Sequence, residues 1–349
     1  MPHSDLRRRL LIAIGAAALP LAAHALDTEE PEDEMVWVHS TECVKGLFLF
    51  ECPEAEALEQ ELRPGGMCPR TVGPGPGMLV DGECCYEVSD ALCGALGCGC
   101  AHGRPMLREV RPLLAGIART HWIDSTLPAP VLVGLSAPER LRLARFWASV
   151  GSHEHSSIAA FHRAALELLA HGAPERLLAA TQRASLDEAR HARHAFTLAS
   201  HFAGATIGPA ALPLGAAIEL AADLPALAAR VVTEGCIEET MSLLAAERML
   251  AECRDPAVHR VLVALVRDER RHVELAWKTV RWAIQAGGQV VADAVAIAFA
   301  EARAPIPNDP EPLSPRLAAW GAVSDERLCA AAARGLAAVI RPVGERLVA

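Results

Sequence analysis

Positive charge is scarce in this 349-residue chain. Lys and Arg number 33 against 43 Asp and Glu, which gives a formal net charge of −10, and no stretch forms an extended basic patch. This argues against a nucleic-acid partner, because such proteins neutralise phosphates with clustered Lys and Arg. Long apolar runs are also missing after residue 25. We therefore expect no stable membrane span in the rest of the chain.

Paired C-x-x-C motifs are absent too, although the chain contains 11 cysteines. Zinc-ribbon and rubredoxin sites use such pairs, so a metal module is the weaker interpretation of these cysteines. Eight of them gather in a Gly/Pro-rich segment, at positions 43, 52, 68, 84, 85, 93, 98 and 100. An even number of cysteines in a short segment predicts disulfides that stabilise a small domain. Their pairing stays open, because eight cysteines allow about 105 connectivities.

The first 25 residues have the three parts of a secretory signal peptide. Three arginines at 7–9 precede an apolar run over 10–23, and Ala-His-Ala at 23–25 forms an A-x-A cleavage site. This predicts an exported protein, periplasmic or secreted, whose mature chain starts near Leu26. An uncleaved membrane anchor is the alternative. The arginines also resemble a loose twin-arginine signal, a route for proteins exported after folding, besides the ordinary Sec route.

The remainder divides into four parts by composition. Residues 26–104 form the Cys-rich region, 105–135 a linker interrupted by prolines, 136–288 an Ala/Leu-rich helical domain, and 289–349 a helical extension. We therefore expect a mainly α protein with a small disulfide-stabilised unit near its N-terminus. The extension should form helices over 290–302 and from 317 to about 343, packed outside the main domain.

Four helices are predicted within residues 136–288. A capping box at Ser136–Glu139 begins the first, which runs to about Ala170, and the second runs from about Pro174 to Ala203. The Gly/Pro-rich stretch 204–223 is long for a loop, and a crossover along a bundle would explain it. The third helix spans about 223–253, and the fourth begins at Asp255-Pro256 and ends at 287–288. The short connection between the first two helices makes them antiparallel neighbours, and with the crossover between the second and third a four-helix bundle is expected.

One five-residue string occurs twice in this domain. It reads DEARH at 187–191 and DERRH at 268–272. In a helix, a Glu and a His three residues apart share one face, so each string offers a carboxylate and an imidazole to one point. From composition alone, an acid-acid-x-x-His string should arise roughly 0.2 times in such a chain. Solvated helix faces are the simpler alternative, but the flanking residues, such as Leu186 and Leu265, are largely apolar.

Each string also has a lone glutamate one helix earlier. Glu154 lies 34 residues before Glu188, and Glu234 lies 35 before Glu269. At a rise of about 1.5 Å per residue, a short reversal returns each lone Glu to about the level of its string. Each half of the domain therefore supplies one Glu and one Glu-x-x-His. Glu238, one turn after Glu234, is the alternative third-helix residue, or a proton donor beside the site.

This constellation resembles the ferritin-like superfamily of di-iron carboxylate proteins, where two helices each give a Glu and two others each give a Glu-x-x-His. The resemblance covers residues 136–288. It implies two iron ions, with manganese possible, because oxygen-rich ligation with one imidazole per ion suits both metals. The ligands it implies are Glu154, Glu188, His191, Glu234, Glu269 and His272.

The resemblance also implies partners for the ligand histidines. In the family an Asp beside the ligands often accepts a hydrogen bond from the His of the opposite helix. We therefore expect Asp187 to contact His272, and Asp268 to contact His191. His194, one turn past His191, is either an extra ligand or, in the alternative we favour, a hydrogen-bonded or surface residue.

The family's activities span oxygenation, N-oxidation, desaturation, peroxide reduction and iron oxidation, and the sequence narrows them. The one tyrosine, Tyr86, lies outside the bundle, so a tyrosyl radical beside the metals has no source. The missing C-x-x-C pairs argue against a complete rubrerythrin, and the flanking regions against a ferritin cage. The resemblance thus implies an exported oxidoreductase that activates O₂ or peroxide, with a possible small-molecule substrate and an unknown electron donor.

Two alternatives remain open. One is a non-catalytic or protective protein that binds iron or manganese in the cell envelope. The other is a manganese catalase-like disproportionation of peroxide, which the same ligand set permits.

Overall fold

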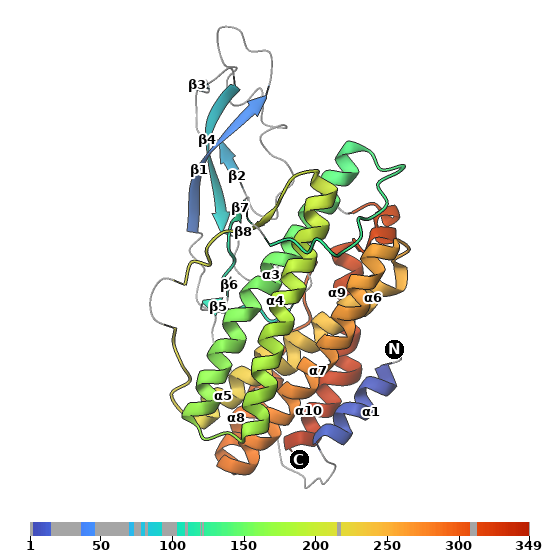
Figure 1. Ribbon diagram of the computed structural model, residues 1–349. Coiled ribbons are helices and arrows are strands. Elements are labelled where there is room, and N and C mark those ends of the chain that lie inside the picture. Colours follow the sequence, from blue (N-terminus) through green and yellow to red (C-terminus); the bar gives the residue numbers. More distant parts are fainter. Residues whose placement is uncertain are drawn as a thin grey trace.

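The computed structural model describes residues 3–14, 36–45, 70–72, 78–80, 83–92, 103–108, 111–118, 120, 122–214, 218–307 and 313–348. The described part of the chain is mainly helical, as predicted (Figure 1). None of its helices is long and apolar enough to cross a membrane.

Two long helices pack side by side along their lengths. Helix α3 (Ala137–Ala170) begins at the predicted capping box, in which the Ser136 side chain accepts a hydrogen bond from the Glu139 amide. Helix α4 (Glu175–Ala203) follows after a reversal at Gly172, whose φ of +67° suits glycine. The tight reversal makes α3 and α4 antiparallel neighbours, drawn in green and yellow-green in Figure 1.

The third predicted helix is present but changes its winding in the middle. Helix α5 (Leu224–Arg230) starts at Asp223, whose side chain accepts from the Ala226 amide. It continues into a nine-residue π-helix, η3 (Val231–Glu239), and then into α6 (Thr240–Glu252). A π-helix bonds residue i to i+5 rather than i+4, so it alters which side chains share a face. This change was not predicted from the sequence.

Helix α7 (Pro256–Gly287) is the fourth of the helices predicted within residues 136–288. Asp255 caps it by accepting from the amides of Ala257 and Val258, as its Asp-Pro start predicted. It packs against α4 on one side and against η3 and α6 on the other. At the η3 contact a side chain on Gly235 would meet Ala276, since an added Cβ would lie 2.6 Å from the Ala276 Cβ. The small residues therefore let these two helices approach closely.

The C-terminal extension is helical, as expected. Helix α8 (Gln289–Ala300) packs against α5, and α9 (Asp325–Gly335) packs against α6. The segment expected as one helix from residue 317 is divided. It comprises the 3₁₀ turn η4 (Pro315–Trp320), α9, a short π-helix η5 (Leu336–Ile340) and α10 (Arg341–Val348). The break comes at Gly321, whose φ is +80°.

Helix α1 (His3–Ile14) lies within residues 1–25, the segment predicted as a signal peptide. It packs against α7, η5 and α10, and its Leu6 and Leu10 are buried in the core they form. Signal-peptide cleavage and export remain predictions.

The N-terminal part also contains strands that the sequence did not lead us to expect. Strand β4 (Glu83–Leu92) pairs antiparallel with β1 (Val36–Lys45), β2 (Arg70–Val72) and β3 (Met78–Val80). The register sets Cys43 opposite Cys85 in the backbone. The predicted disulfides of this region depend on side chains outside the described part.

Two short pairs of antiparallel strands involve the linker. Strand β5 (Leu107–Arg108) pairs with β6 (Arg111–Pro112), and β7 (Ile117–Ala118) pairs with β8 (Gly208–Pro209). The second ladder joins the linker to the long connection between α4 and α5.

Candidate metal centre

Six acidic and histidine side chains meet between the four longest helical segments. One group of metal-compatible atoms comes from Glu154, Glu188, His191 and Glu269, and a second from Glu188, Glu239 and His272. Within each group the atoms lie within 4.8 Å of one another. All six side chains are at most 2% exposed. Helix α3 supplies one residue, α4 and α7 two each, and η3 one, its last residue.

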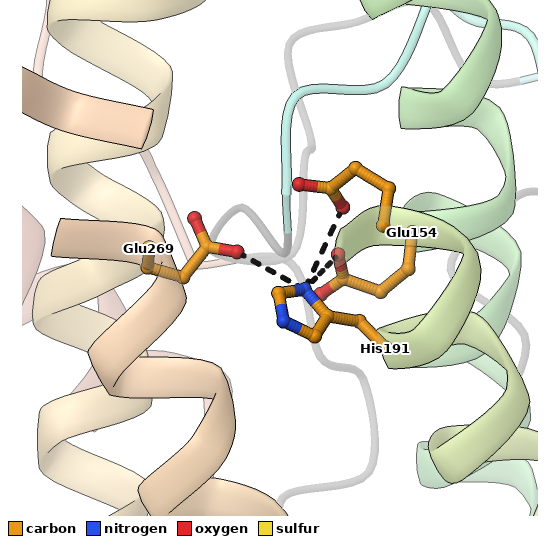
Figure 2. A group of neighbouring side chains, drawn as sticks. Glu154, His191 and Glu269 are labelled. Atoms are coloured by element: carbon orange, nitrogen blue, oxygen red, sulfur yellow. Dashed lines mark ion pairs between the residues drawn. The ribbon is translucent and has the colours of Figure 1, made fainter. Parts of the chain in front are cut away.

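His191 lies among three carboxylates (Figure 2). Its Nδ1 is 3.8 Å from Glu154 Oε2 and 3.5 Å from Glu269 Oε1. The same nitrogen is 3.8 Å from Glu188 Oε2, from the preceding turn of its own helix. These separations exceed a hydrogen bond, as expected where one ion would sit between the ligand atoms.

His272 has a similar environment. Its Nδ1 lies 2.9 Å from Glu188 Oε1 and 3.7 Å from Glu269 Oε1. Glu188 therefore turns one oxygen to each imidazole, and Glu269 Oε1 lies close to both. The two rings are 6.0 Å apart between centroids. Glu188 and Glu269 thus lie near both imidazoles, whereas Glu154 and Glu239 each belong to one group.

Among the residues that the structure describes, the buried inward-facing atoms of these side chains have no hydrogen-bond partner, and even the 2.9 Å contact of His272 Nδ1 with Glu188 Oε1 is not aligned for a hydrogen bond. These atoms are Glu154 Oε2, both carboxylate oxygens of Glu188, Glu239 and Glu269, and Nδ1 of His191 and His272. Leaving even one such atom unsatisfied costs about 1–3 kcal/mol. Four carboxylates and two neutral imidazoles would balance the charge of two divalent cations. The residues therefore fit a pair of divalent metal ions.

Burial and mutual repulsion shift the acidity of the cluster. Burial, reinforced by the nearby Glu188 charge, raises the pKa of Glu154 well above its usual range. Burial and the Glu239 charge do the same to the pKa of Glu269. The metal-free cluster thus resists carrying all its negative charges at once, and metal binding would displace protons.

The outer nitrogens of both histidines contact aspartates. His191 Nε2 is 3.3 Å from Asp268 Oδ2, and His272 Nε2 is 3.3 Å from Asp187 Oδ2. These are the two contacts that the family resemblance implies. Arg190 Nη2 bridges the aspartates, at 2.6 Å from Asp187 and 2.5 Å from Asp268. An aspartate at Nε2 favours the proton there, which leaves the Nδ1 lone pair facing the cluster.

These aspartates stay ionised. Burial alone would raise the pKa of Asp187, but hydrogen bonds from His272, Arg190 and Arg271 outweigh it and lower that pKa below its usual range. In the same way His191 and two arginines lower the pKa of Asp268 against the effect of burial. The arginines Arg190, Arg267 and Arg271 thus offset the charge of the aspartates outside the cluster.

The structure does not bring Glu234 into either group. Its carboxylate instead pairs with Arg163 and with Arg104, whose Nη2 lies 3.2 Å from Glu234 Oε2. The residue from this helix that joins Glu188 and His272 is Glu239. The physical reason is the π-helix: with i to i+5 bonding, Glu234 and Glu239 stand about one turn apart on one face. The spacing argument assumed regular α-helices in both halves.

The two remaining candidates also lie outside the groups. Burial and the charges of Glu234 and Glu239 raise the pKa of Glu238 to about 7, but no metal-compatible group includes it. His194 Nε2 is 3.3 Å from Asp124 Oδ2, which agrees with a hydrogen-bonded role. The Glu238-Glu239 doublet was visible in the sequence, but no local pattern singled out its second member.

Residues 103–106 form a buried strap over the Glu154 side of the cluster. Three serine hydroxyls hold its backbone: the Gly103 amide donates to Ser242 Oγ at 2.8 Å, Arg104 to Ser157 Oγ at 2.9 Å, and Met106 to Ser156 Oγ at 2.9 Å. Gly103 has a φ of +68°, and an added Cβ would lie 3.0 Å from Glu154 Oε2 and 2.8 Å from Ser157 Oγ. A glycine is therefore required twice, for its backbone angle and for its lack of a side chain.

Gly103→Ala should lower divalent-metal affinity at least about tenfold, because the new Cβ displaces the Glu154 carboxylate. Gly172→Ala is the matched control: its φ of +67° is nearly the same, but nothing lies within 4 Å of its added Cβ. Both variants should lose about 1–2 kcal/mol of folding free energy from backbone strain. Metal titration of the two proteins tests this, and equal affinities would show that the strap does not position Glu154.

A small void lies beside His272, between α3, α4, α5 and α7. Phe161, Thr181 and Thr279 are among its lining residues, and its volume is about 20 Å³. That is room for roughly one water molecule. This void therefore suits a diatomic or water-sized molecule better than an organic one.

Comparison with known protein families, with curated proteins and with solved structures finds no match to this chain. The case for its function therefore rests on the geometry of the cluster.

Proposed function

We propose that the chain is a ferritin-like four-helix protein that holds two metal ions, iron or alternatively manganese, and uses them to reduce O₂ or peroxide. One observation carries this proposal. Nine buried ligand atoms converge from four helices without hydrogen-bond partners, and their carboxylates carry the charge that two divalent ions would balance.

In this proposal Glu154 and His191 would hold one ion, Glu239 and His272 would hold the other, and Glu188 and Glu269 would contribute to both. Carboxylate oxygens with one imidazole per ion suit iron and manganese better than metals that prefer thiolates. Two reduced irons side by side supply electrons together to O₂ or peroxide. Asp187 and Asp268 hold the imidazoles in the orientation that directs Nδ1 inward.

The size of the void decides which kind of reaction is proposed. The void of about 20 Å³ beside His272 admits O₂ or peroxide but no organic substrate, and the larger groove between α4 and α7 has His272 and Asp187 but none of the four cluster carboxylates in its lining. This favours reduction of O₂ or peroxide, including disproportionation by manganese, over oxygenation of a bound organic molecule. Protective metal binding without turnover is the second candidate, since the same void limits access. Export through the predicted signal peptide belongs to the proposal, and the electron donor is left open.

Anaerobic loading followed by an oxidant pulse tests the proposal. The protein is loaded with Fe²⁺ or Mn²⁺, its metal content is measured, and O₂ or H₂O₂ is then added while its consumption and the absorbance are recorded. We expect two ions per chain and rapid consumption of one oxidant. Two ions without any consumption would support protective metal binding instead. Absence of bound metal would contradict both candidates.

A further inference from the structure

A second feature lies on the outer surface between α4 and α7. The two helices run antiparallel there and border a groove of about 850 Å³. Its α4 side extends from Arg176 to Arg190, which spans roughly 21 Å of helix. A volume of this size lies within the usual range of small-molecule sites, about 300–1,000 Å³.

The groove is strongly basic in a protein whose net charge is −10. Six cationic side chains line it against two acidic ones, Asp187 and Glu274; the cations are Arg176, Arg183, Arg190, Arg271, Lys278 and Arg281. On α4 the arginines recur every seven residues, which places them on one face. The groove thus gathers positive charge between α4 and α7.

Two of these arginines are free to bind a ligand. Arg190 and Arg271 already bond to Asp187, and Lys278 lies 3.4 Å from Glu274. Arg176 and Arg183 make no hydrogen bond or ion pair within the described part of the chain. A guanidinium group pairs with a carboxylate through two parallel hydrogen bonds, which gives both affinity and orientation.

The floor of the groove is apolar. Leu177, Ala184 and Leu275 are buried there, and they form a small core with Phe161 against which Ala180 and Trp282 pack. Free inorganic anions would gain nothing from such a floor, and a neutral hydrocarbon would gain nothing from the arginines. The lining therefore fits a molecule with both an anionic head and an apolar body.

We propose that this groove binds a small amphipathic carboxylate, whose apolar chain lies along Ala180, Leu275 and Trp282 and whose head pairs with Arg183. The groove adjoins the metal cluster at His272 and Asp187, which are among its lining residues, but Ala180, Arg183 and Trp282 belong to neither metal-compatible group. Binding in the groove does not require bound metal, so this proposal can be tested independently of the proposed function.

Binding of octanoate to the full chain, measured by calorimetry with and without loaded metal, tests the inference. Octanoate should bind at least about tenfold more tightly than acetate, which lacks the chain, and than 1-octanol, which lacks the charge. Arg183→Gln should weaken octanoate binding about tenfold. Ala180→Glu should abolish it, because a carboxylate then occupies the floor.

The matched control is Arg260→Gln, an exposed arginine of α7 that does not line the groove. It should bind octanoate like the parent protein, and thermal melting should show all three variants folded. No octanoate binding, equal binding of acetate or inorganic phosphate, or an Arg183→Gln variant that binds like the parent would each overturn the proposal. Capture of an acidic protein segment without octanoate binding would also overturn it.

Discussion

Glu188→Ala is expected to remove both metal ions, whereas Glu239→Ala is expected to remove one. The Glu188 carboxylate turns an oxygen toward each imidazole, at 3.8 Å from His191 Nδ1 and 2.9 Å from His272 Nδ1. Glu239 belongs only to the group of His272. Metal analysis after anaerobic loading should therefore give almost no bound metal for the first variant and one ion per chain for the second.

The other two carboxylates of the cluster, Glu269 and Glu154, allow the same comparison of metal content. Glu269→Ala should behave like Glu188→Ala, because Glu269 Oε1 lies 3.5 Å from His191 Nδ1 and 3.7 Å from His272 Nδ1. Glu154→Ala should behave like Glu239→Ala, because Glu154 contacts His191 alone of the two histidines. Glu238→Gln is the matched control, since Glu238 precedes Glu239 but belongs to neither group. If Glu239→Ala retained two ions while Glu238→Gln lost one, the assignment of the π-helix residue would be wrong.

Replacing the cluster carboxylate Glu239 should change the free energy of unfolding in opposite directions with and without bound metal. In the metal-free protein Glu239 is buried beside other acids, and both of its oxygens lack hydrogen-bond partners. Glu239→Gln removes a charge that burial and the neighbouring Glu188 disfavour, so it should raise the free energy of unfolding of the metal-free protein. With metal bound, the variant should be less stable than the parent, because a ligand is lost. Urea unfolding under both conditions measures the two effects.

The elements that sequence predicted best are those fixed by local chemistry. The Ser136–Glu139 capping box and the Asp255 cap satisfy amides that any helix leaves open, so α3 and α7 begin where predicted. The Glu-x-x-His strings needed only helical geometry to place Glu188 with His191 and Glu269 with His272. The contacts of Asp187 and Asp268 followed from the family resemblance, which already encodes how facing helices meet.

The features that sequence missed depend on contacts between distant segments. The π-helix of η3 has no local signature; the close approach of Gly235 to Ala276 becomes visible only once α7 is in place. Because of this π-helix, Glu239 rather than Glu234 lies in the metal-compatible cluster.

The strap at Gly103 was also missed. It lies 51 positions before Glu154 in the chain, and nothing in the sequence near either residue indicates that they touch. The basic groove likewise arises only when Arg183 and Lys278, on separate helices, face one space.

Glu234→Ala should lower the free energy of unfolding by about 3–5 kcal/mol. Its carboxylate is 6% exposed and lies between two guanidinium groups, those of Arg163 and Arg104, which are 5% and 6% exposed. Arg104 also lies over the Phe161 ring, 5.2 Å from its centroid, so it has little access to water. Without Glu234 both arginines keep their charge in a buried site, because a guanidinium does not release its proton.

Urea unfolding of the metal-free protein measures this loss without any contribution from metal binding. Glu274→Ala is the control: Glu274 pairs with Lys278 at 3.4 Å, but its side chain is 31% exposed, so its loss should cost less than about 1 kcal/mol. Equal losses in the two variants would mean that water reaches the Arg104–Glu234–Arg163 group. The folded fraction of Glu234→Ala should still bind two ions. Loss of one ion from that fraction would return Glu234 to the ligand set that sequence spacing predicted, in place of Glu239.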